Sequence, residues 1–567
     1  MANYNREKRK YVIGAVATGI VLIYIVRLFT LQIMSDDYKK NADSNAFLKK
    51  IQYPSRGVIT DRNGKLLVYN QPSYDIMVVM NEQQGVDTLD LCASLGITKE
   101  YYVRRMEEIK DRHRNPGYSR YTQQLFMSQL SSEEFCVFQE KLFRFPGFYV
   151  QRRSIRQYQS PYAALVLGDI GEVSPADVEE DEYYQNGDFI GKQGVERAYE
   201  KQLRGKKGIQ ILLRDARGRI KGRYMDGKLD TKTVPGKNLT LGLDLELQAL
   251  GERLMEGKLG SIVAIEPSTG EVLCMVSSPT YDPRMMVGRQ RGKNHLALSR
   301  NPLKPLLNRS IMGQYPPGST FKMCTAVAAL ESGIITPSSI IQDRGIYTYY
   351  RDPQPMCWVY RQGGSTHGRI NVTQAITESC NYFFYEVGRL TGIRTLDSYA
   401  SQFGLGQSTG IEIGDSSGVL ASPEWADSHN QEWTDGQTIT AAIGQSYNLF
   451  TPLQLANYIA TLVGGGEHYQ AHLLKNVKEY DNSRLLYVYD DEPLNTVEMS
   501  DSTIEAVTKG MHELTVSGGV AFAFRDCVVS AGAKTGSAQV GTDIANGVFV
   551  AYAPYEDPEI AVAIVIE

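Results

Sequence analysis

A long apolar run close to the N-terminus places the strongest limit on how this chain can fold. The run begins at Tyr11, includes Arg27 near one end and continues to about Met34. A helix of about 23 residues can span a bilayer, and Arg27 can extend its guanidinium to the outer interface. The run is preceded by basic residues: Arg6, Lys8, Arg9 and Lys10. Basic residues before a span place the N-terminus in the cytoplasm and the rest of the chain outside.

The competing interpretation of this run is a cleaved signal peptide. Cleavage sites carry small residues, whereas residues 31–34 (LQIM) are bulky. We therefore expect a cytoplasmic tail over residues 1–10 and an uncleaved transmembrane anchor over residues 11–34. No second run of this length follows in the sequence. The remaining chain is then expected on the periplasmic, or extracytoplasmic, side of the inner membrane.

The size and composition of the chain indicate several folded domains and exclude some functions. A chain of 567 residues with 42% hydrophobic and 22% charged residues suits two or three globular domains. A net charge of -4 gives no basic field for nucleic acid. Seven cysteines without a CxxC pair do not predict a disulfide framework.

Turn signals divide the extracytoplasmic part into two domains. Pro235-Gly236 marks the boundary, so we expect domains over residues 35–235 and 236–567. In the second domain, β-type runs at 261–266 and 271–276 predict one hairpin, and runs at 547–553 and 560–566 predict another. A further strand is expected over residues 528–534. Strands at both ends with helical patterns between them predict an α+β fold with one antiparallel sheet flanked by helices.

The segment STFK, residues 319–322, is the first candidate for chemistry. We expect a buried apolar helix over residues 319–331, which places Ser319 and Lys322 on one helix face. The helix N-terminus offers free backbone N–H groups to an oxyanion. A nearby amine that burial keeps neutral can act as the base for a serine nucleophile. The motif alone is weak evidence, since a chain of this length contains roughly two S-x-x-K matches by chance.

Two further short motifs follow in the sequence. Ser379-Cys380-Asn381 follows residues 371–376, where a helix is predicted to start, and a polar triplet at a helix end is usually only a cap. The segment KTGS, residues 534–537, is predicted at the end of the strand that begins at residue 528, where it can align with an extended peptide. Each is weak alone. In the order S-x-x-K, S-x-N and K-T-G, they form the set of the penicillin-recognising serine enzymes.

The chain resembles the class B penicillin-binding proteins over nearly its whole length. The spacing within 303–322 and 367–381 is most similar to penicillin-binding protein 2, the elongation-type member; division-type and sporulation-type members are the competitors. The resemblance implies an elongated mixed α/β pedestal of the dimerisation type over residues 35–235. It also implies a serine β-lactamase-like transpeptidase domain with a five-stranded antiparallel sheet over residues 236–567. The segments that carry the resemblance are RLFTLQ (27–32), 56–64, GKQGVERAYE (191–200), LRG (203–205), YPPGSTFK (315–322) and TPLQLA (451–456).

The resemblance implies an acylation mechanism. Ser319 would attack the penultimate D-Ala carbonyl of a peptidoglycan stem peptide and form an acyl-enzyme. Lys322 would take the serine proton. Ser379 and Asn381 would relay protons and position the substrate amide.

The resemblance also implies how the substrate binds. Lys534 and Thr535, with Gly536 and Ser537 in the same motif, would bind the substrate carboxylate. The backbone N–H groups of Ser319 and Ser537 would form the oxyanion hole. β-Lactams, which mimic D-Ala-D-Ala, would acylate Ser319 as well.

The resemblance implies no cofactor, and it implies membrane partners. These are a polytopic RodA-type glycan polymerase and other proteins of the elongation complex. Two alternatives stay open: a D,D-carboxypeptidase or β-lactam-hydrolysing enzyme with the same motifs, and a non-catalytic scaffold of a wall-synthesis complex. The intact motifs favour catalysis, and the anchor and pedestal disfavour a compact β-lactamase. The sequence stops at Glu567, within or just after the last predicted strand, where relatives usually continue into a further helix.

Four residues offer donors that suit zinc, namely Asp343, Cys357, His367 and Cys380. Their spacing is irregular and matches no zinc-finger pattern. We therefore expect ordinary buried or loop residues at these positions and assign no metal ligand.

Overall fold

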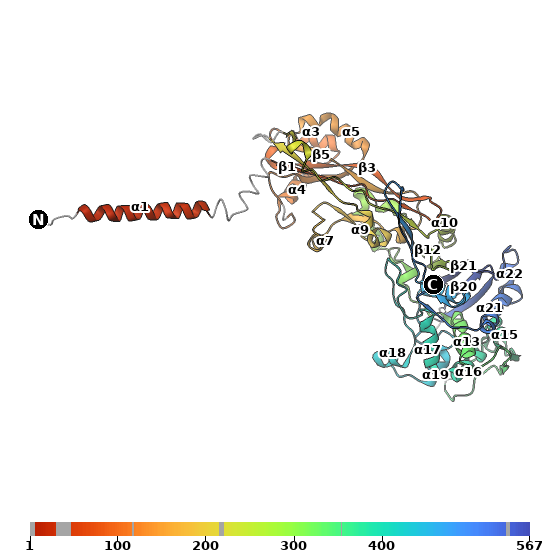
Figure 1. Cartoon of the computed structure of the whole chain (residues 1–567). Helices are drawn as coiled ribbons and strands as arrows, with labels where there is room; N and C mark the ends of the chain where they lie inside the picture. Colours follow the sequence, from red (N-terminus) through yellow and green to blue (C-terminus); the bar gives the residue numbers. More distant parts are fainter. Residues whose placement is uncertain (1–5, 30–46, 116–117, 215–219, 353, 540–544) are drawn as a thin grey trace. The chain divides into compact units, whose positions relative to one another are not determined.

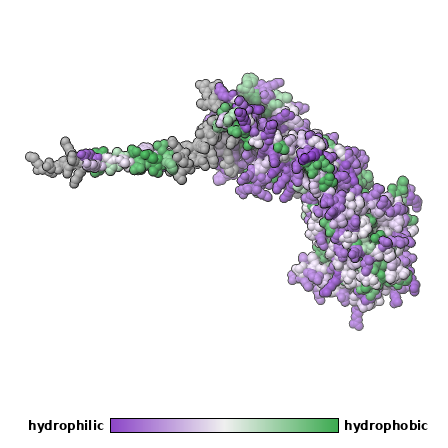
Figure 2. Space-filling model, viewed as in Figure 1, coloured by the Kyte–Doolittle hydropathy of each residue, from purple (hydrophilic) through white to green (hydrophobic). Residues whose placement is uncertain are grey.

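A computed structural model of the chain describes residues 6–29, 47–115, 118–214, 220–352, 354–539 and 545–567. The first element is helix α1 (Arg6–Phe29). Its stretch Lys10–Phe29 is long and apolar enough to cross a membrane, and its side chains are unburied. Figure 2 shows the hydrophobic colouring along this helix. Within the described ranges it is the one helix of this kind, which supports a membrane anchor. Residues 30–34 of the expected anchor lie outside the described residues.

The rest of the chain forms two compact units from interleaved segments (Figure 1). The first unit contains Pro72–Ser154 and Gly205–Pro235 after the N-terminal segment Met1–Ser55. The second unit contains Arg56–Gln71, Ile155–Arg204 and Gly236–Glu567. The chain passes between the units within two long strands, β3 (Leu66–Val78) and β5 (Phe148–Tyr158).

In the first unit, helices α4 and α5 pack against strand β4. Strand β4 lies between α4 and α5 in the chain and pairs antiparallel with the second half of β3. The side chain of its residue Phe126 is fully buried. Capping residues fix the helix ends: Asp87 accepts two backbone N–H groups, and Ser131 forms a capping box with Glu134. A separate sheet has the order β1-β8-β9. The elements are α3 (Thr88–Leu95), α4 (Lys99–Lys110), β4 (Gln124–Leu130), α5 (Ser132–Lys141), β1 (Phe47–Gln52), β8 (Gly208–Arg214) and β9 (Ile220–Arg223).

The second unit is built on a five-stranded antiparallel sheet with the order β12-β11-β21-β20-β19. This confirms the expected sheet, and both predicted hairpins are present as β11–β12 and β20–β21. The strand expected over residues 528–534 instead begins at Gly532, because Val528 and Val529 are solvent-exposed and precede the pairing with β20. The strands are β11 (Gly260–Ile265), β12 (Val272–Ser278), β19 (Gly532–Gln539), β20 (Ala545–Ala553) and β21 (Ile560–Ile566).

Helices cover this sheet and form a cluster beside it (Figure 1). α20 packs on β21 and β11, α21 packs on β19, and α10 packs on β12. Helix α13 is buried at each position from Lys322 to Leu330, which explains why its sequence is mostly apolar apart from Lys322 and Thr325. The helices are α10 (Leu245–Leu254), α13 (Lys322–Glu331), α15 (Val372–Thr377), α16 (Asn381–Thr391), α17 (Ile393–Gln402), α19 (Asp435–Ala441), α20 (Pro452–Val463) and α21 (Asp501–Val516).

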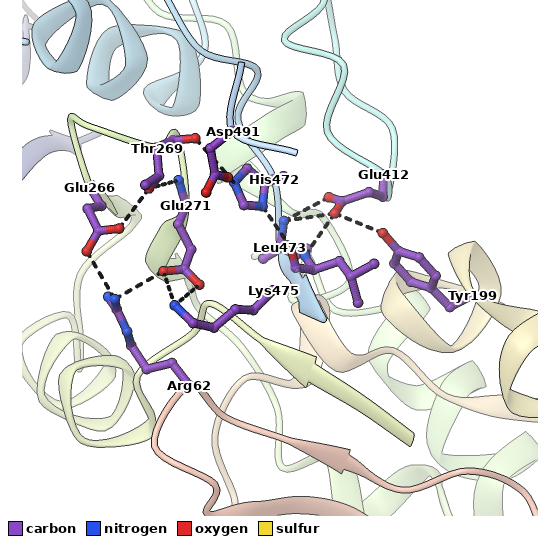
Figure 3. Close-up of polar contacts among 11 residues, drawn as sticks. Arg62, Tyr199, Glu266, Thr269, Glu271, Glu412, His472, Leu473, Lys475 and Asp491 are labelled. Atoms are coloured by element: carbon purple, nitrogen blue, oxygen red, sulfur yellow. Dashed lines mark hydrogen bonds and ion pairs between the residues drawn. The ribbon is translucent and has the colours of Figure 1, made fainter. Parts of the chain in front are cut away.

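The early segment at Arg56–Gln71 joins this unit through strand pairing and buried charge. The short strand β2 (Ile59–Thr60) pairs with β3 and runs parallel to β10 (Asn238–Leu241). Beyond the turn, Arg62 forms ion pairs with Glu266 at 3.0 Å and with Glu271 at 3.1 Å (Figure 3). The Glu271 carboxylate also accepts both hydrogen bonds of Lys475 at 3.0 Å. A nearly buried carboxylate thus lies between two cations, which satisfies its charge.

Candidate active site

The predicted nucleophile lies in a tight turn at the start of α13. Residues Gly318–Phe321 form a 3-10 turn (η7), and the α-helix begins at Lys322, three residues later than the sequence predicts. The turn begins at Gly318, whose φ of 55° is in the left-handed region that favours glycine. Its N–H donates to the carbonyl of Gly444 at 2.9 Å. Gly444 was not singled out by the sequence analysis, because its role depends on a backbone contact far along the chain.

The predicted base, Lys322, is fully buried below this turn. Its Nζ donates to Ser379 O at 2.8 Å and to Asn381 Oδ1 at 2.6 Å, and it lies 3.3 Å from Ser379 Oγ. Burial lowers the pKa of Lys322 to about 8, although the nearby Cys380 and Cys357 act in the opposite direction. At pH 7 about one tenth of the molecules then have the neutral amine that a general base requires, and this fraction grows as the pH rises toward 8.

The S-x-N segment lies in the turn between α15 and α16. Ser379 has a φ of 51°, and Cys380 caps α16, whose first residue is Asn381. The Ser379 hydroxyl is near both lysines, because Lys534 Nζ also donates to its Oγ at 2.8 Å. Burial lowers the pKa of Lys534 well below its usual value, and the charge of Lys322 lowers it further. One serine hydroxyl thus links the two amines, which suits proton transfer between them.

Strand β19 brings the K-T-G segment against the nucleophile's turn. A Cβ added at Gly536 would lie 2.8 Å from Pro317 O and 3.3 Å from the backbone N of Ser319. One added at Gly318 would lie 3.1 Å from Ser537 O. Thr535 is half-buried and its carbonyl accepts from Lys534 Nζ at 3.0 Å. The structure thus brings all three predicted motifs together, with K-T-G-S inside β19 and not at its end.

A second group of reactive side chains converges directly beside the S-x-N segment. The ligand atoms of Asp343, Cys357, His367 and Cys380, here called the Cys357 cluster, lie within 4.8 Å of one another. The Cys357 and Cys380 sulfurs are 3.9 Å apart, and His367 Nδ1 lies 2.8 Å from Asp343 Oδ2. The hydrogen bond with Cys380 lowers the pKa of Cys357, which favours the thiolate that metals bind.

The chemistry of these four donors fits Zn²⁺, which binds sulfur, imidazole and carboxylate ligands in a tetrahedron. Irregular spacing in the sequence argued against a metal site. The structure removes that argument, because the four residues come from separate turns and helix ends that the fold brings together. A metal held here would fix Cys380, and with it the neighbouring Ser379 and Asn381.

Comparison with known proteins agrees with this geometry. The family described as "Penicillin binding protein transpeptidase domain" matches residues 260–567, and "Penicillin-binding Protein dimerisation domain" matches residues 51–241. The Acinetobacter baumannii protein named peptidoglycan D,D-transpeptidase MrdA is 30% identical, over 100% of this chain and 86% of its own length. The chain belongs to the penicillin-binding protein 2 family.

Solved structures of this family share the fold. The Helicobacter pylori penicillin-binding protein 2 in complex with MreC matches with a TM-score of 0.76 and 27% identity, covering 92% of this chain and 95% of that one. A structure titled "Structural coordination of polymerization and crosslinking by a peptidoglycan synthase complex" matches with a TM-score of 0.69 and 25% identity. It covers 99% of this chain and 94% of the matched chain. The class B resemblance and the two-part fold expected from the sequence are confirmed.

Proposed function

We propose that this chain is a serine D,D-transpeptidase that cross-links peptidoglycan stem peptides during cell elongation. The observation that carries the proposal is the convergence of Lys322 and Lys534 on the Ser379 hydroxyl, beside the turn that holds Ser319. Membership of a family whose relatives are named peptidoglycan D,D-transpeptidase supports the same reaction.

The reaction begins with acyl transfer to the serine. Ser319 Oγ attacks the penultimate D-Ala carbonyl while Lys322 takes its proton. The bond to the terminal D-Ala breaks, and that D-Ala leaves with a proton relayed through Ser379. Backbone N–H groups of Ser319 and Ser537 stabilise the oxyanion in the transition state. The amine of a second stem peptide then attacks the acyl-enzyme, forms the cross-link and restores the Ser319 hydroxyl.

The K-T-G segment and the side-chain amide of Asn381 bind the substrate. Lys534 and Thr535 offer a cation and a hydroxyl to the terminal carboxylate of the stem peptide. Gly536 allows β19 to approach the turn of Ser319 closely, so that a peptide aligned along the free edge of β19 can lie beside Ser319. β-Lactams would enter by the same contacts and acylate Ser319.

The chain's location and partners follow as further parts of the proposal. Basic residues before α1 favour a cytoplasmic N-terminus, with both units outside the inner membrane. A related structure is a complex with MreC, and another is titled as a peptidoglycan synthase complex. We therefore expect this chain to act with a polytopic RodA-type polymerase and other elongation-complex proteins.

Covalent labelling with a fluorescent penicillin tests the reaction. The parent protein should give a fluorescent band on a denaturing gel that Ser319→Ala abolishes. Replacement of the exposed serine in Ser299→Ala should leave the band unchanged. Rapid loss of the label would favour a carboxypeptidase or β-lactam-hydrolysing enzyme. No band from a folded parent would favour a non-catalytic scaffold.

A further inference from the structure

A buried tyrosine is inserted into the backbone of the nucleophile's helix. Tyr458 lies on α20 and is fully buried. Its hydroxyl accepts a hydrogen bond from the N–H of Cys324 at 2.9 Å and donates one to the carbonyl of Thr320 at 3.3 Å. In a regular α-helix, the N–H of residue 324 would donate directly to the carbonyl of residue 320. The phenol oxygen therefore stands in the place of one backbone hydrogen bond.

This insertion coincides with the change of helix type beside the nucleophile. Gly318–Phe321 form a 3-10 turn, in which the N–H of Lys322 donates to the carbonyl of Ser319. Side chains three residues apart are aligned in a 3-10 turn, whereas in an α-helix they are offset by roughly 60°. The 3-10 turn therefore directs the side chains of Ser319 and Lys322 toward the same side of the helix. An inserted side chain is a recognised cause of such a local break in a helix.

The position of the Tyr458 hydroxyl is itself fixed by packing. The ring meets Phe403 edge-on, with the ring centroids 5.2 Å apart. Helix α20 begins with a capping box between Thr451 and Gln454, and Pro452 occupies its first turn. Because all of its residues from Pro452 to Leu462 are buried, the helix has little freedom to move. The hydroxyl thus acts from a rigid element.

We propose that Tyr458 is a positioning residue for the acylation step, which its hydroxyl serves by holding Ser319 and Lys322 in the aligned 3-10 geometry. The inference rests on the proposed function, because it assigns how the serine meets its base. Tyr458 takes no part in bond making. Without the hydroxyl, the N–H of Cys324 can donate a hydrogen bond directly to the carbonyl of Thr320. The turn can then relax to an α-helix, in which the side chains of Ser319 and Lys322 are no longer aligned.

The test compares Tyr458→Phe with the parent in fluorescent penicillin labelling over time. The ring and its contact with Phe403 are kept, and only the hydroxyl is lost. We expect the acylation rate to fall by roughly ten- to hundredfold, as expected for a reacting group misplaced by up to about 1 Å. Tyr158→Phe is the matched control. It removes the hydroxyl of another buried tyrosine, which donates to Gly168 O at 2.6 Å, and should leave the rate unchanged.

The pH profile separates positioning from general loosening of the site. Lys322 is surrounded by Lys534, Cys357 and Cys380, and none of its hydrogen bonds involves Tyr458. We therefore expect Tyr458→Phe to lower the plateau rate while the pH at half-maximal rate stays near that of the parent. A site opened to water would instead shift that pH upward, and this result would overturn the positioning role.

A rescue variant keeps the inference testable if Tyr458→Phe folds poorly. 4-Aminophenylalanine at position 458 retains a group that can both donate and accept a hydrogen bond, and should restore most of the rate. Equal rates for parent and Tyr458→Phe would refute the inference and leave the proposed function intact. A parent that is not labelled at all would instead refute the proposed function.

Discussion

A methyl group added at Gly444 should disable the active site without touching any predicted catalytic side chain. Gly444 has a φ of 74°, where an added side chain costs about 1 kcal/mol. The new Cβ would also lie 2.1 Å from Gly318 O and 2.9 Å from Gly318 N. A normal carbon–oxygen contact requires a separation about 1 Å larger, so Gly318 must move by about that distance. Gly318 directly precedes Ser319, and the nucleophile moves with it.

A displacement of about 1 Å at a reacting group lowers the rate about a hundredfold, or about 2.7 kcal/mol in the barrier. Gly333→Ala is the matched control, because Gly333 has a φ of 69° but nothing lies within 4 Å of its added Cβ. Acylation time courses with fluorescent penicillin, with melting curves alongside, compare the two variants. Both variants should lose stability through backbone strain, and Gly444→Ala should lose more because of the overlap with Gly318. We expect slow acylation only in Gly444→Ala. Equal acylation rates would refute the argument that this backbone contact positions the nucleophile.

Three further results are expected. The acylation rate should rise with pH through about 8, because Lys322 acts as a base only when it is neutral. At pH 7 only about one tenth of the molecules have a neutral Lys322. A rate that is independent of pH between 6 and 9 would exclude Lys322 as the base. Removing metal with a strong chelator should lower both the melting temperature and the acylation rate if the Cys357 cluster holds Zn²⁺, and no change in either would count against a metal there. Glu271→Ala should lower the free energy of unfolding in urea by about 2 kcal/mol, because it leaves Lys475 and Arg62 without a shared buried partner. The exposed Glu246→Ala should change it by less than about 1 kcal/mol, and equal losses would contradict the role given to burial.

The features that were predicted from the sequence depend on local patterns. Both hairpins of the main sheet follow from short β-type runs separated by turn residues, and both are present. The three motifs can be recognised because each is a contiguous segment. Their order along the chain is that of the penicillin-recognising serine enzymes. A local pattern also predicts α13, since a long apolar run that follows two prolines is typical of a buried helix.

The features that were missed depend on contacts between distant residues. The start of α13 is shifted to Lys322, where the hydroxyl of Tyr458 interrupts the helical hydrogen bonds. The assignment of residues 56–71 to the second unit depends on pairings such as Ile59 with Leu239, which no local pattern encodes. Spacing in the sequence does not indicate the Cys357 cluster, because only the tertiary fold brings its four donors together.

The order of strands in the main sheet has a consequence for how the protein reaches its folded state. β21 lies between β11 and β20 at the centre of the sheet, although it is the last of the five strands to be synthesised. One edge of the β11–β12 hairpin therefore stays unpaired until nearly 300 further residues have been synthesised. Contacts across so long a stretch of chain form slowly. Strand edges that stay exposed for this long make the incompletely folded domain prone to aggregation.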